Sequence, residues 1–371
     1  MTDAAPPPLR AAIIGTGAIA HAHAQAIAEL APRIELVAVA DVDPVRAREF
    51  ADRFAASASV HAGLTDVLSA GGVDLVHICT PPQTHVPLAL ESLRAGVPVL
   101  VEKPTALNLA EMDELVAVSR ETGVPALTVY QHRFGPAALR LTRLLAEGAL
   151  GRPLVATCET LWYRPAEYFD VPWRGRWDVE GGGPTMGHGI HQFDLLLAVL
   201  GPWRRLSAFA ARQALPTDTE DVSMALVEFE SGALATVVNS LVSPRETSRL
   251  RFDFEHATVE VEHLYGYSDA DWTFTPASGH EDLTALWQAD PSDEVSGHRL
   301  QLSAVIDALV TGTPPSVGAE DARRTLEFAA ATYASAFRGA PVAAGDIVDP
   351  DPFHSRMDGG MVPWPPVKEA L

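Results

Sequence analysis

The feature that most constrains the fold of this chain is a glycine pattern close to its start. The apolar run Ala11–Ile14 ends at Gly15, Gly17 follows two residues later, and Ala20 takes the third place of a G-x-G-x-x-G/A pattern. In such a pattern the first glycine makes a tight turn off a strand, and the second lets the backbone approach a pyrophosphate. The third, small residue keeps the next helix close to the sheet. The pattern therefore predicts a strand, a turn and a helix from about Ala18 whose first N–H groups face phosphates.

A second apolar run supports this nucleotide-binding interpretation. Ile34–Ala40 ends in Asp41, about 20 residues after the glycine pattern, as expected for the acidic residue of a dinucleotide site. A carboxylate there accepts hydrogen bonds from a ribose 2′-hydroxyl and repels a 2′-phosphate, so NAD is the expected cofactor and NADP is disfavoured. Asp43 is a second candidate, although it also suits the N-cap of a helix that begins near Pro44. The residues expected to line the dinucleotide here are Gly15, Gly17, Ala18, Ile19 and Asp41.

The composition is typical of a globular protein large enough for two domains. The chain has 371 residues, of which 47% are hydrophobic and 20% are charged. Its net charge of −21 repels nucleic acid and anionic membranes, so we expect neither as a partner. No apolar stretch reaches membrane-spanning length, and the Pro-rich start lacks the pattern of a signal peptide. These observations predict a cytoplasmic protein, with a mobile tail over residues 1–8.

In the first part of the chain, predicted strands and helices alternate with short links. This alternation is typical of a Rossmann fold with a doubly wound parallel sheet, which we assign to residues 9–131. Ligands of such sheets bind beyond the carboxyl ends of the strands. The turns Thr80–Gln83 and Glu102–Pro104 follow two of the predicted strands, so we expect them at the same edge as the glycine pattern.

From residue 132 to residue 371 the pattern favours an α+β domain with a large, mostly antiparallel open sheet. The expected strands are Leu154–Trp162, Arg205–Ala214, Val222–Glu230, Ala233–Val242, Leu250–His263 and Trp272–Thr275. Two of these strands carry apolar residues on both faces, so one face of the sheet is an exposed apolar patch unless another subunit covers it. We therefore expect a homodimer or homotetramer that forms through this sheet. The final segment, residues 349–371, is expected to wrap either a neighbouring subunit or the substrate cleft.

Three motifs in a fixed order resemble those of a known family. They are the glycine pattern, Thr80–His85 with the sequence TPPQTH, and Ala95–Pro104 with the sequence AGVPVLVEKP. The chain thereby resembles the glucose–fructose oxidoreductase, inositol dehydrogenase and rhizopine-catabolism family, from about Leu9 to Val342. The resemblance implies that Thr80, Pro81, His85, Glu102 and Lys103 contact the cofactor.

The same resemblance implies a catalytic role for Lys103, near both the nicotinamide ribose and the substrate hydroxyl. A lysine beside a positively charged nicotinamide has a lowered pKa or polarises the reacting oxygen. Glu102 is expected either to pair with Lys103 or to contact the cofactor. The family aside, a lysine just after a strand is as readily a surface residue.

A glycine-rich stretch in the second domain carries the other catalytic prediction. Gly181–Gly183 lead into a predicted helix with His188, His191 and Asp194. The family has Asp-x-Gly-x-His here, and Gly187 replaces its Asp, which questions the usual proton relay and leaves His188 as a neighbouring substitute. His191 is the expected general acid/base, because histidine exchanges protons near neutrality. A buried core histidine is the alternative interpretation.

Aromatic faces and arginine donors around this stretch suit a sugar or polyol, which offers C–H faces and hydroxyl edges. The residues expected to contact substrate are Arg133, Tyr163, Trp173, Arg174, Trp177, His188 and His191. For any single aromatic residue, packing of the loop is the alternative. No metal is expected, because the histidine spacings form only partial ligand patterns.

Together these patterns predict an NAD-dependent dehydrogenase that acts on the CH–OH groups of a sugar, inositol or other polyhydroxy compound. His191 takes the hydroxyl proton as hydride leaves the same carbon, and Lys103 stabilises the developing alkoxide. Two alternatives stay open: an NAD-dependent glycosidase of the same fold, and a non-catalytic NAD-binding sensor, which Gly187 would permit.

Overall fold

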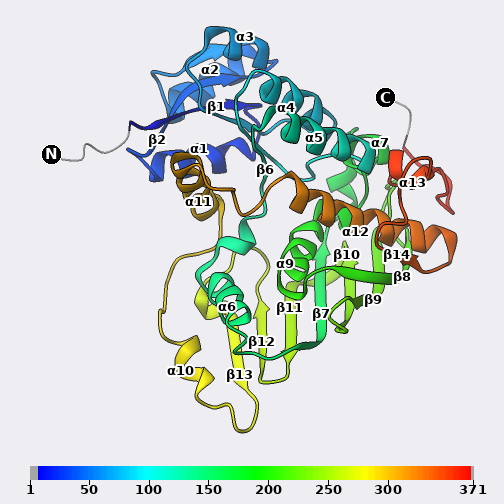
Figure 1. Cartoon of the computed structure of the whole chain (residues 1–371). Helices are drawn as coiled ribbons and strands as arrows, with labels where there is room; N and C mark the ends of the chain where they lie inside the picture. The colour runs from blue at the N-terminus through cyan, green and yellow to red at the C-terminus, as the bar shows by residue number, and fades with distance from the viewer. Residues whose placement is uncertain (1–6, 369–371) are drawn as a thin grey trace. The chain divides into compact units, whose positions relative to one another are not determined.

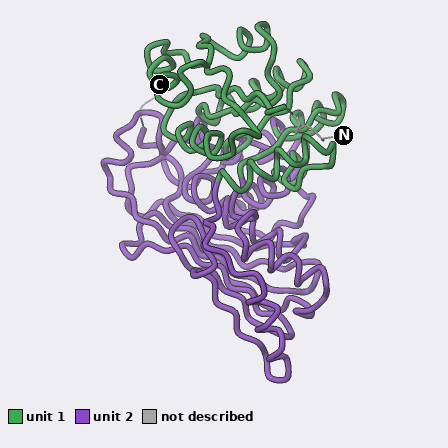
Figure 2. The backbone as a smooth tube through the Cα atoms, turned by 90° about the vertical axis from the view of Figure 1, so that its left-hand side faces the viewer, with its two compact units in different colours: residues 1–106, 112–129, 298–322 green, residues 107–111, 130–297, 323–371 purple. Residues whose placement is uncertain are grey.

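The computed structural model describes residues 7–368, so most of the predicted tail over residues 1–8 and the last three residues lie outside the described chain. The described chain divides into two compact units (Figure 2). The first contains residues up to 106, 112–129 and 298–322, and the second contains residues 107–111, 130–297 and 323 onward. The chain therefore enters the first unit again after it has formed most of the second.

The first unit contains a six-stranded sheet in the order β3-β2-β1-β4-β5-β6, in which all pairs are parallel. Its strands are β1 Leu9–Ile14, β2 Ile34–Ala40, β3 Ser59–His61, β4 Leu75–Ile78, β5 Val99–Val101 and β6 Ala126–Thr128. The helices that lie wholly or mainly in this unit are α1 Ala20–Glu29, α2 Pro44–Phe54, α3 Leu64–Ala70, α4 His85–Arg94, α5 Leu109–Thr122 and α11 His298–Thr311. This order reverses at β1, as the predicted doubly wound sheet requires.

Helix α11 belongs to the core of this first sheet although it follows β13 in the chain. It packs beside α1 (Figure 1). Its residues Leu302, Val305 and Ile306 are buried in one cluster with Ile13 of β1 and Ile27 of α1. The strands read as apolar runs because helices cover them and leave no face to water.

The second unit contains an eight-stranded sheet in the order β13-β12-β11-β7-β10-β9-β8-β14. Its strands are β7 Pro153–Tyr163, β8 Trp203–Ala211, β9 Val222–Phe229, β10 Leu234–Ser240, β11 Val242–Phe254, β12 Ala257–Glu262, β13 Trp272–Pro276 and β14 Val342–Ala343. Only β7 and β10 pair in parallel among these described strands. The mostly antiparallel sheet, and with it the predicted fold class, is confirmed.

One face of this second sheet is covered by helices. The helices of the unit are α6 Pro136–Ala146, α7 Trp177–Glu180, α8 Pro184–Gly187, α9 Ile190–Leu200, α10 Leu283–Trp287, α12 Ala319–Arg338 and α13 Pro352–Ser355. Helix α9 contacts β7 and β11, and Phe328 of α12 packs its ring 5.1 Å from Phe193 and 5.8 Å from Trp203. On the other face Phe209 is 81% exposed and Leu226 is 66% exposed.

Two local predictions were wrong, each because of a contact distant in sequence. The expected single strand Leu250–His263 is a hairpin, since Glu255 turns back to accept hydrogen bonds from the backbone and guanidinium of Arg152. The expected single helix through His188 is broken at His188–Gly189 into α8 and α9. Gly189 packs so closely on Asn239 that a Cβ would lie 2.1 Å from the amide oxygen.

No helix among the described residues is long and apolar enough to cross a membrane.

Candidate functional site

The glycine turn has the geometry that a dinucleotide site needs. Gly15 has φ +86°, and a Cβ there would lie 2.8 Å from the Thr80 methyl group, so only glycine fits. At Gly17 a Cβ would meet no atom within 4 Å, which leaves open space above the backbone. Ala18 and Ile19 complete the turn, and α1 begins at Ala20, slightly later than expected. The first unit therefore offers the open backbone that a pyrophosphate requires.

Asp41 lies directly after β2, as predicted, and its carboxylate is held firmly. It accepts hydrogen bonds from the Thr16 backbone and hydroxyl at 2.8 Å each, from the Asp43 backbone at 2.9 Å and from the Arg46 guanidinium at 2.6 Å. Burial alone raises the pKa of this carboxyl, but the hydrogen bonds from Arg46, Asp43 and Thr16 outweigh it and hold the pKa at about 2. Asp41 is therefore ionised at neutral pH.

Asp43 and Arg46 both contact Asp41, but only Asp43 was considered from the sequence. Asp43 is the N-cap of α2, where its side chain accepts from the Val45 and Arg46 backbone N–H groups. This is the structural alternative that its sequence position allowed. Arg46 was missed, because an arginine in the first turn of an exposed helix carries no local signal of a site. An arginine at this place can accommodate the 2′-phosphate of NADP, so Arg46 acts against the preference for NAD that Asp41 creates.

The motif after β4 is tied to the motif after β5 by one histidine. The His85 ring is buried, with Nε2 2.7 Å from the Thr80 carbonyl and Nδ1 2.8 Å from the Pro104 carbonyl. Burial lowers the pKa of His85, against the effect of these two carbonyls. His85 therefore positions both turns, and contact of Thr80 and Pro81 with a cofactor stays a prediction.

Glu102 is the centre of a buried hydrogen-bond network in the first unit. Its Oε1 lies 2.9 Å from Nε2 of His23 and 3.1 Å from Nε2 of His298, and its Oε2 accepts from the Lys103 backbone at 3.1 Å. Burial alone raises the pKa of Glu102, but the hydrogen bonds from both histidines outweigh it and place the pKa well below its usual range. Glu102 is thus an ionised carboxylate that fixes the backbone just before half-buried Lys103.

The network fixes the hydrogen positions of its histidines. A carboxylate only accepts, so Nε2 of His23 carries the hydrogen. Nδ1 of His23 must then accept from Nδ1 of His77, which lies 2.8 Å away. Burial lowers the pKa of both His23 and His77, so each ring is neutral. These residues were not predicted, because they lie on three separate elements.

His23, Glu102 and His298 are also the one group of described residues whose donor atoms, within 4.8 Å of one another, suit a metal. Each donor atom already takes part in a hydrogen bond of the network. Since those bonds account for the geometry, the expectation that the protein uses no metal stays a prediction.

In the second unit, two glycines are required by close packing. A Cβ on Gly182 would lie 2.1 Å from the Tyr333 hydroxyl, and one on Gly183 would lie 1.9 Å from the Glu220 carbonyl oxygen. The Glu220 carboxylate accepts from the Gly183 backbone at 2.9 Å, the Thr185 backbone at 3.1 Å and the Tyr333 hydroxyl at 2.8 Å. Burial raises the pKa of Glu220 to about 7, although these donors lower it. Glu220 thus holds the turn that leads to His188 and His191.

His191 lies in the first turn of α9 and is 3% exposed. Its Nε2 lies 3.5 Å from the Tyr265 hydroxyl, and the His132 ring packs 5.2 Å away. Tyr265, 43% exposed, also accepts a hydrogen bond from the Gln131 amide. Tyr265 was missed, because nothing in its surrounding Leu-Tyr-Gly-Tyr sequence points to a distant histidine. At Gly187 a Cβ would meet nothing within 4 Å, so the family's aspartate would fit there.

His188 lies in the break between α8 and α9, and its ring packs 4.9 Å from Trp162. The Arg164 guanidinium lies 4.8 Å from the same indole. Successive residues of a strand point to opposite faces, so Tyr163 lies on the other face of β7 from Trp162. The structure therefore brings Trp162 to His188, and contact of Tyr163 with substrate stays a prediction.

Arg133 is joined to Asp194 by two hydrogen bonds, at 2.6 Å from Nε and 2.5 Å from Nη2. Asp194 is fully buried on α9, so this pair fixes the helix that carries His191. Arg174 lies between two aromatic rings, 4.1 Å from Tyr168 and 4.4 Å from Trp173, in a stretch without helix or strand. Trp173 is 37% exposed, so this aromatic–arginine stack is open to a ligand.

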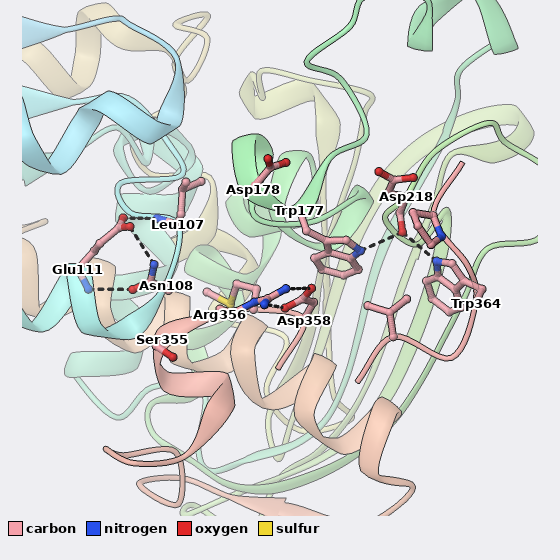
Figure 3. A pocket seen from close by; sticks show the side chains of 13 residues that line it. Leu107, Asn108, Glu111, Trp177, Asp178, Asp218, Ser355, Arg356, Asp358 and Trp364 are labelled. Carbon is pink, nitrogen blue, oxygen red and sulfur yellow. Dashed lines mark hydrogen bonds and ion pairs between the residues drawn. The ribbon is translucent and has the colours of Figure 1, made fainter. Parts of the chain in front are cut away.

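Trp177 lines a cavity of about 650 Å³ in the second unit, and neither His188 nor His191 lines that cavity (Figure 3). Its indole N–H donates to the Asp218 carbonyl at 2.9 Å, and Trp364 donates to the same oxygen at 2.8 Å. The carboxylates around the cavity are also paired, as Asp358 is with Arg356. Trp177 therefore has packing contacts here, and its contact with substrate stays a prediction.

Comparison with known proteins places this chain in a class of oxidoreductases with an NAD-binding Rossmann fold. A family model described as an oxidoreductase family with an NAD-binding Rossmann fold matches residues 9–131, and a GFO/IDH/MocA C-terminal domain model matches residues 138–260. The chain belongs to the GFO/IDH/MocA oxidoreductase family, as its three motifs indicated. The prediction of an oxidoreductase is confirmed.

Similar proteins extend over most of the chain. A D-apiose dehydrogenase from Paraburkholderia graminis is 28% identical, covering 95% of this chain and 94% of that protein. A D-glucoside 3-dehydrogenase from Escherichia coli is 27% identical, covering 90% and 97%. Among solved structures, the WlbA dehydrogenase from Chromobacterium violaceum, in complex with NADH and UDP-GlcNAcA, is 28% identical with a TM-score of 0.80, covering 94% and 100%.

Proposed function

We propose that this protein is an NAD-dependent dehydrogenase that transfers a hydride between nicotinamide and a CH–OH or C=O carbon of a sugar, inositol or other polyhydroxy compound. The observation that carries the proposal is the packing of His191 against Tyr265 beside His188 and Trp162. This cluster combines proton-exchanging groups with aromatic faces, which is what a carbohydrate hydroxyl needs. The relatives named for sugar oxidation support it.

The roles of the chain's own residues follow from their surroundings. When bound, NAD supplies the hydride acceptor. His191, held in place by the helix that Arg133 and Asp194 fix, accepts the hydroxyl proton through Nε2. Lys103, whose backbone is fixed by Glu102, stabilises the alkoxide with its ammonium group. Trp173 and Arg174 orient the polyhydroxy ring.

The cofactor proposed is NAD rather than NADP. Asp41 is ionised and would repel a 2′-phosphate, although Arg46 lies beside it and partly offsets its charge. Initial rates with NAD and NADP at equal concentration test this. A higher kcat/KM with NADP would contradict the proposal, and Asp41→Ser should move the preference toward NADP by retaining Arg46.

The function itself is tested with a panel of sugars, inositols and their keto forms, followed by NADH absorbance in both directions. Lys103→Ala is expected to lower turnover by about 100-fold or more with little change in NAD affinity. Unchanged turnover would contradict the role of Lys103. Bound cofactor that is never consumed during hydrolysis would indicate a glycosidase, and binding without turnover would indicate a sensor; neither alternative is favoured by the named relatives.

We also propose a homodimer or homotetramer that forms through the open face of the second sheet. Phe209, Met224, Leu226 and Leu234 are half or more exposed there, and the ladder places Phe209 opposite Met224. Such a patch on a folded chain usually meets a partner. Light scattering should give more than one subunit, and Leu226→Lys should weaken assembly. A monomer at micromolar concentration would contradict this proposal.

A further inference from the structure

The C-terminal segment, residues 352–368, packs against other parts of the second unit of the same chain. We call this segment the C-terminal strap. Its far end is held by Asp218, whose carbonyl accepts from the Trp364 indole at 2.8 Å. The Asp218 carboxylate accepts from the Val367 backbone at 2.6 Å and from the Lys368 backbone at 2.9 Å. Three hydrogen bonds thus converge on one residue of the loop between β8 and β9.

The strap has two further contacts within the second unit. The Lys368 ammonium group donates to the Phe169 carbonyl and lies 5.9 Å from the Phe169 ring. The Arg212 guanidinium donates to the Pro365 carbonyl at 2.8 Å and to the Thr217 carbonyl at 3.1 Å. The strap is therefore joined both to the loop around Asp218 and to the start of the aromatic–arginine segment.

The loop around Asp218 is itself hydrogen-bonded to the aromatic–arginine segment. The Asp218 carbonyl also accepts from Trp177, as Figure 3 shows, so the two indoles share one acceptor. The Asp218 backbone N–H donates to the Gly175 carbonyl at 2.8 Å, and the Thr217 hydroxyl donates to it at 3.0 Å. Gly175 has φ +69°, and a Cβ there would lie 2.3 Å from that hydroxyl. Loop and segment are thus packed without spare room.

The segment that these contacts hold has little regular secondary structure. Residues 170–176, between a short 3₁₀ turn (η3, Ala166–Phe169) and α7, form no helix or strand. They include Trp173 and Arg174, whose stack is open to a ligand. A loop that is fixed before substrate arrives loses less conformational entropy on binding.

We propose that the C-terminal strap positions residues 169–177 for substrate, so that the end of the chain contributes to substrate affinity. The proposal rests on the proposed function, in which Trp173 and Arg174 meet the polyhydroxy substrate. It also answers where the final segment goes: it packs against this chain's own second unit. Trp364 and Lys368 are positioning residues, because they act on substrate through the loop they hold.

The test is the double variant Trp364→Phe with Lys368→Met in the full chain. It keeps the ring and the aliphatic stem but removes two hydrogen bonds to the loop and segment. We expect KM for the polyhydroxy substrate to rise about fivefold to tenfold, with kcat and KM for NAD changed less than about twofold. Amide hydrogen exchange in residues 169–177 should become faster. Met361→Ser is the matched control, because Met361 is exposed on the strap and should change neither quantity.

Exchange and kinetics separate the possible failures. Unchanged exchange in residues 169–177 would overturn the strap proposal, whatever the enzyme does. Faster exchange with an unchanged substrate KM would overturn its role in affinity. If the unaltered protein oxidises no polyhydroxy compound, the proposed function fails, while the exchange measurement still decides whether the strap orders the segment.

Discussion

Glu102 in the first unit and Glu220 in the second are both buried carboxylates that hold a turn in front of a proposed catalytic residue. Glu102 accepts from two histidine rings and one backbone N–H group, and its pKa lies well below its usual range. Glu220 accepts from two backbone N–H groups and a tyrosine hydroxyl, and burial raises its pKa to about 7.

The difference teaches that the nature of the donors decides the charge of a buried carboxylate. Both side chains pay the same kind of desolvation cost, and hydrogen-bond donors surround each of them. Imidazole groups offset the cost for Glu102, so it stays ionised at every pH near neutrality. Backbone N–H groups and a hydroxyl do not fully offset it for Glu220, so the second turn is held by a group that titrates near pH 7.

The largest expected effect concerns the turn that Glu220 holds. Gly183→Ala should destabilise the protein by about 4 kcal/mol or more, because its Cβ would overlap the Glu220 carbonyl oxygen at 1.9 Å. Gly187→Ala is the matched control and should change stability by less than about 1 kcal/mol, since that Cβ meets nothing within 4 Å. Urea unfolding measures both. Equal effects would mean that close packing does not explain the glycine run.

The next effect distinguishes the Glu102 network from the donors around Glu220. Glu102→Gln should cost about 3 kcal/mol, because it removes the charge that two imidazole N–H groups face and turns an amide N–H toward the Lys103 backbone. Free energies of unfolding in urea at about pH 8 measure it. Glu220→Gln at the same pH should be close to neutral, so a larger loss there than at Glu102 would reverse the comparison.

Of the two buried glutamates, only Glu220 should make stability depend on pH near neutrality. Its folded pKa of about 7 exceeds its usual value of 4.5, so its contribution is fully present below about pH 4.5 and is lost as the pH rises through 7. Relative to Glu220→Gln, the unaltered protein should lose about 2 kcal/mol between about pH 5 and pH 8. Glu102→Gln should show a constant difference over that interval. A flat Glu220→Gln difference would show that Glu220 does not titrate there.

The smallest expected effect lies at the edge of the Glu102 network. His298→Gln should cost about 1 kcal/mol, because His298 is partly exposed and a glutamine amide can still donate to Glu102. His23→Gln is the contrasting variant: His23 is buried and would also lose its bond to His77, so its cost should be larger. Thermal unfolding ranks the two. The reverse order would mean that His23 is not the inner member of the network.

The sequence was sufficient to predict features that depend only on neighbouring residues in the chain. The turn at Gly15 and the acid at Asp41 lie where their patterns placed them, because a strand, a glycine and a helix start impose their own backbone geometry. The hairpin at Glu255 and the break at Gly189 could not be read in this way. Each depends on a residue more than 40 positions away, Arg152 or Asn239, that shares no local pattern with it.

The sequence by itself determined the family, the two kinds of sheet and the identity of the glycine turn, since short-range sterics and hydrophobic periodicity are written residue by residue. Only the tertiary structure decided which side chains meet: His298 reaches Glu102 from 196 positions away, and Tyr265 reaches His191 from 74. It also decided that Trp162 and not Tyr163 faces His188, because the pairing of β7 sets which alternate residues are turned toward the helices.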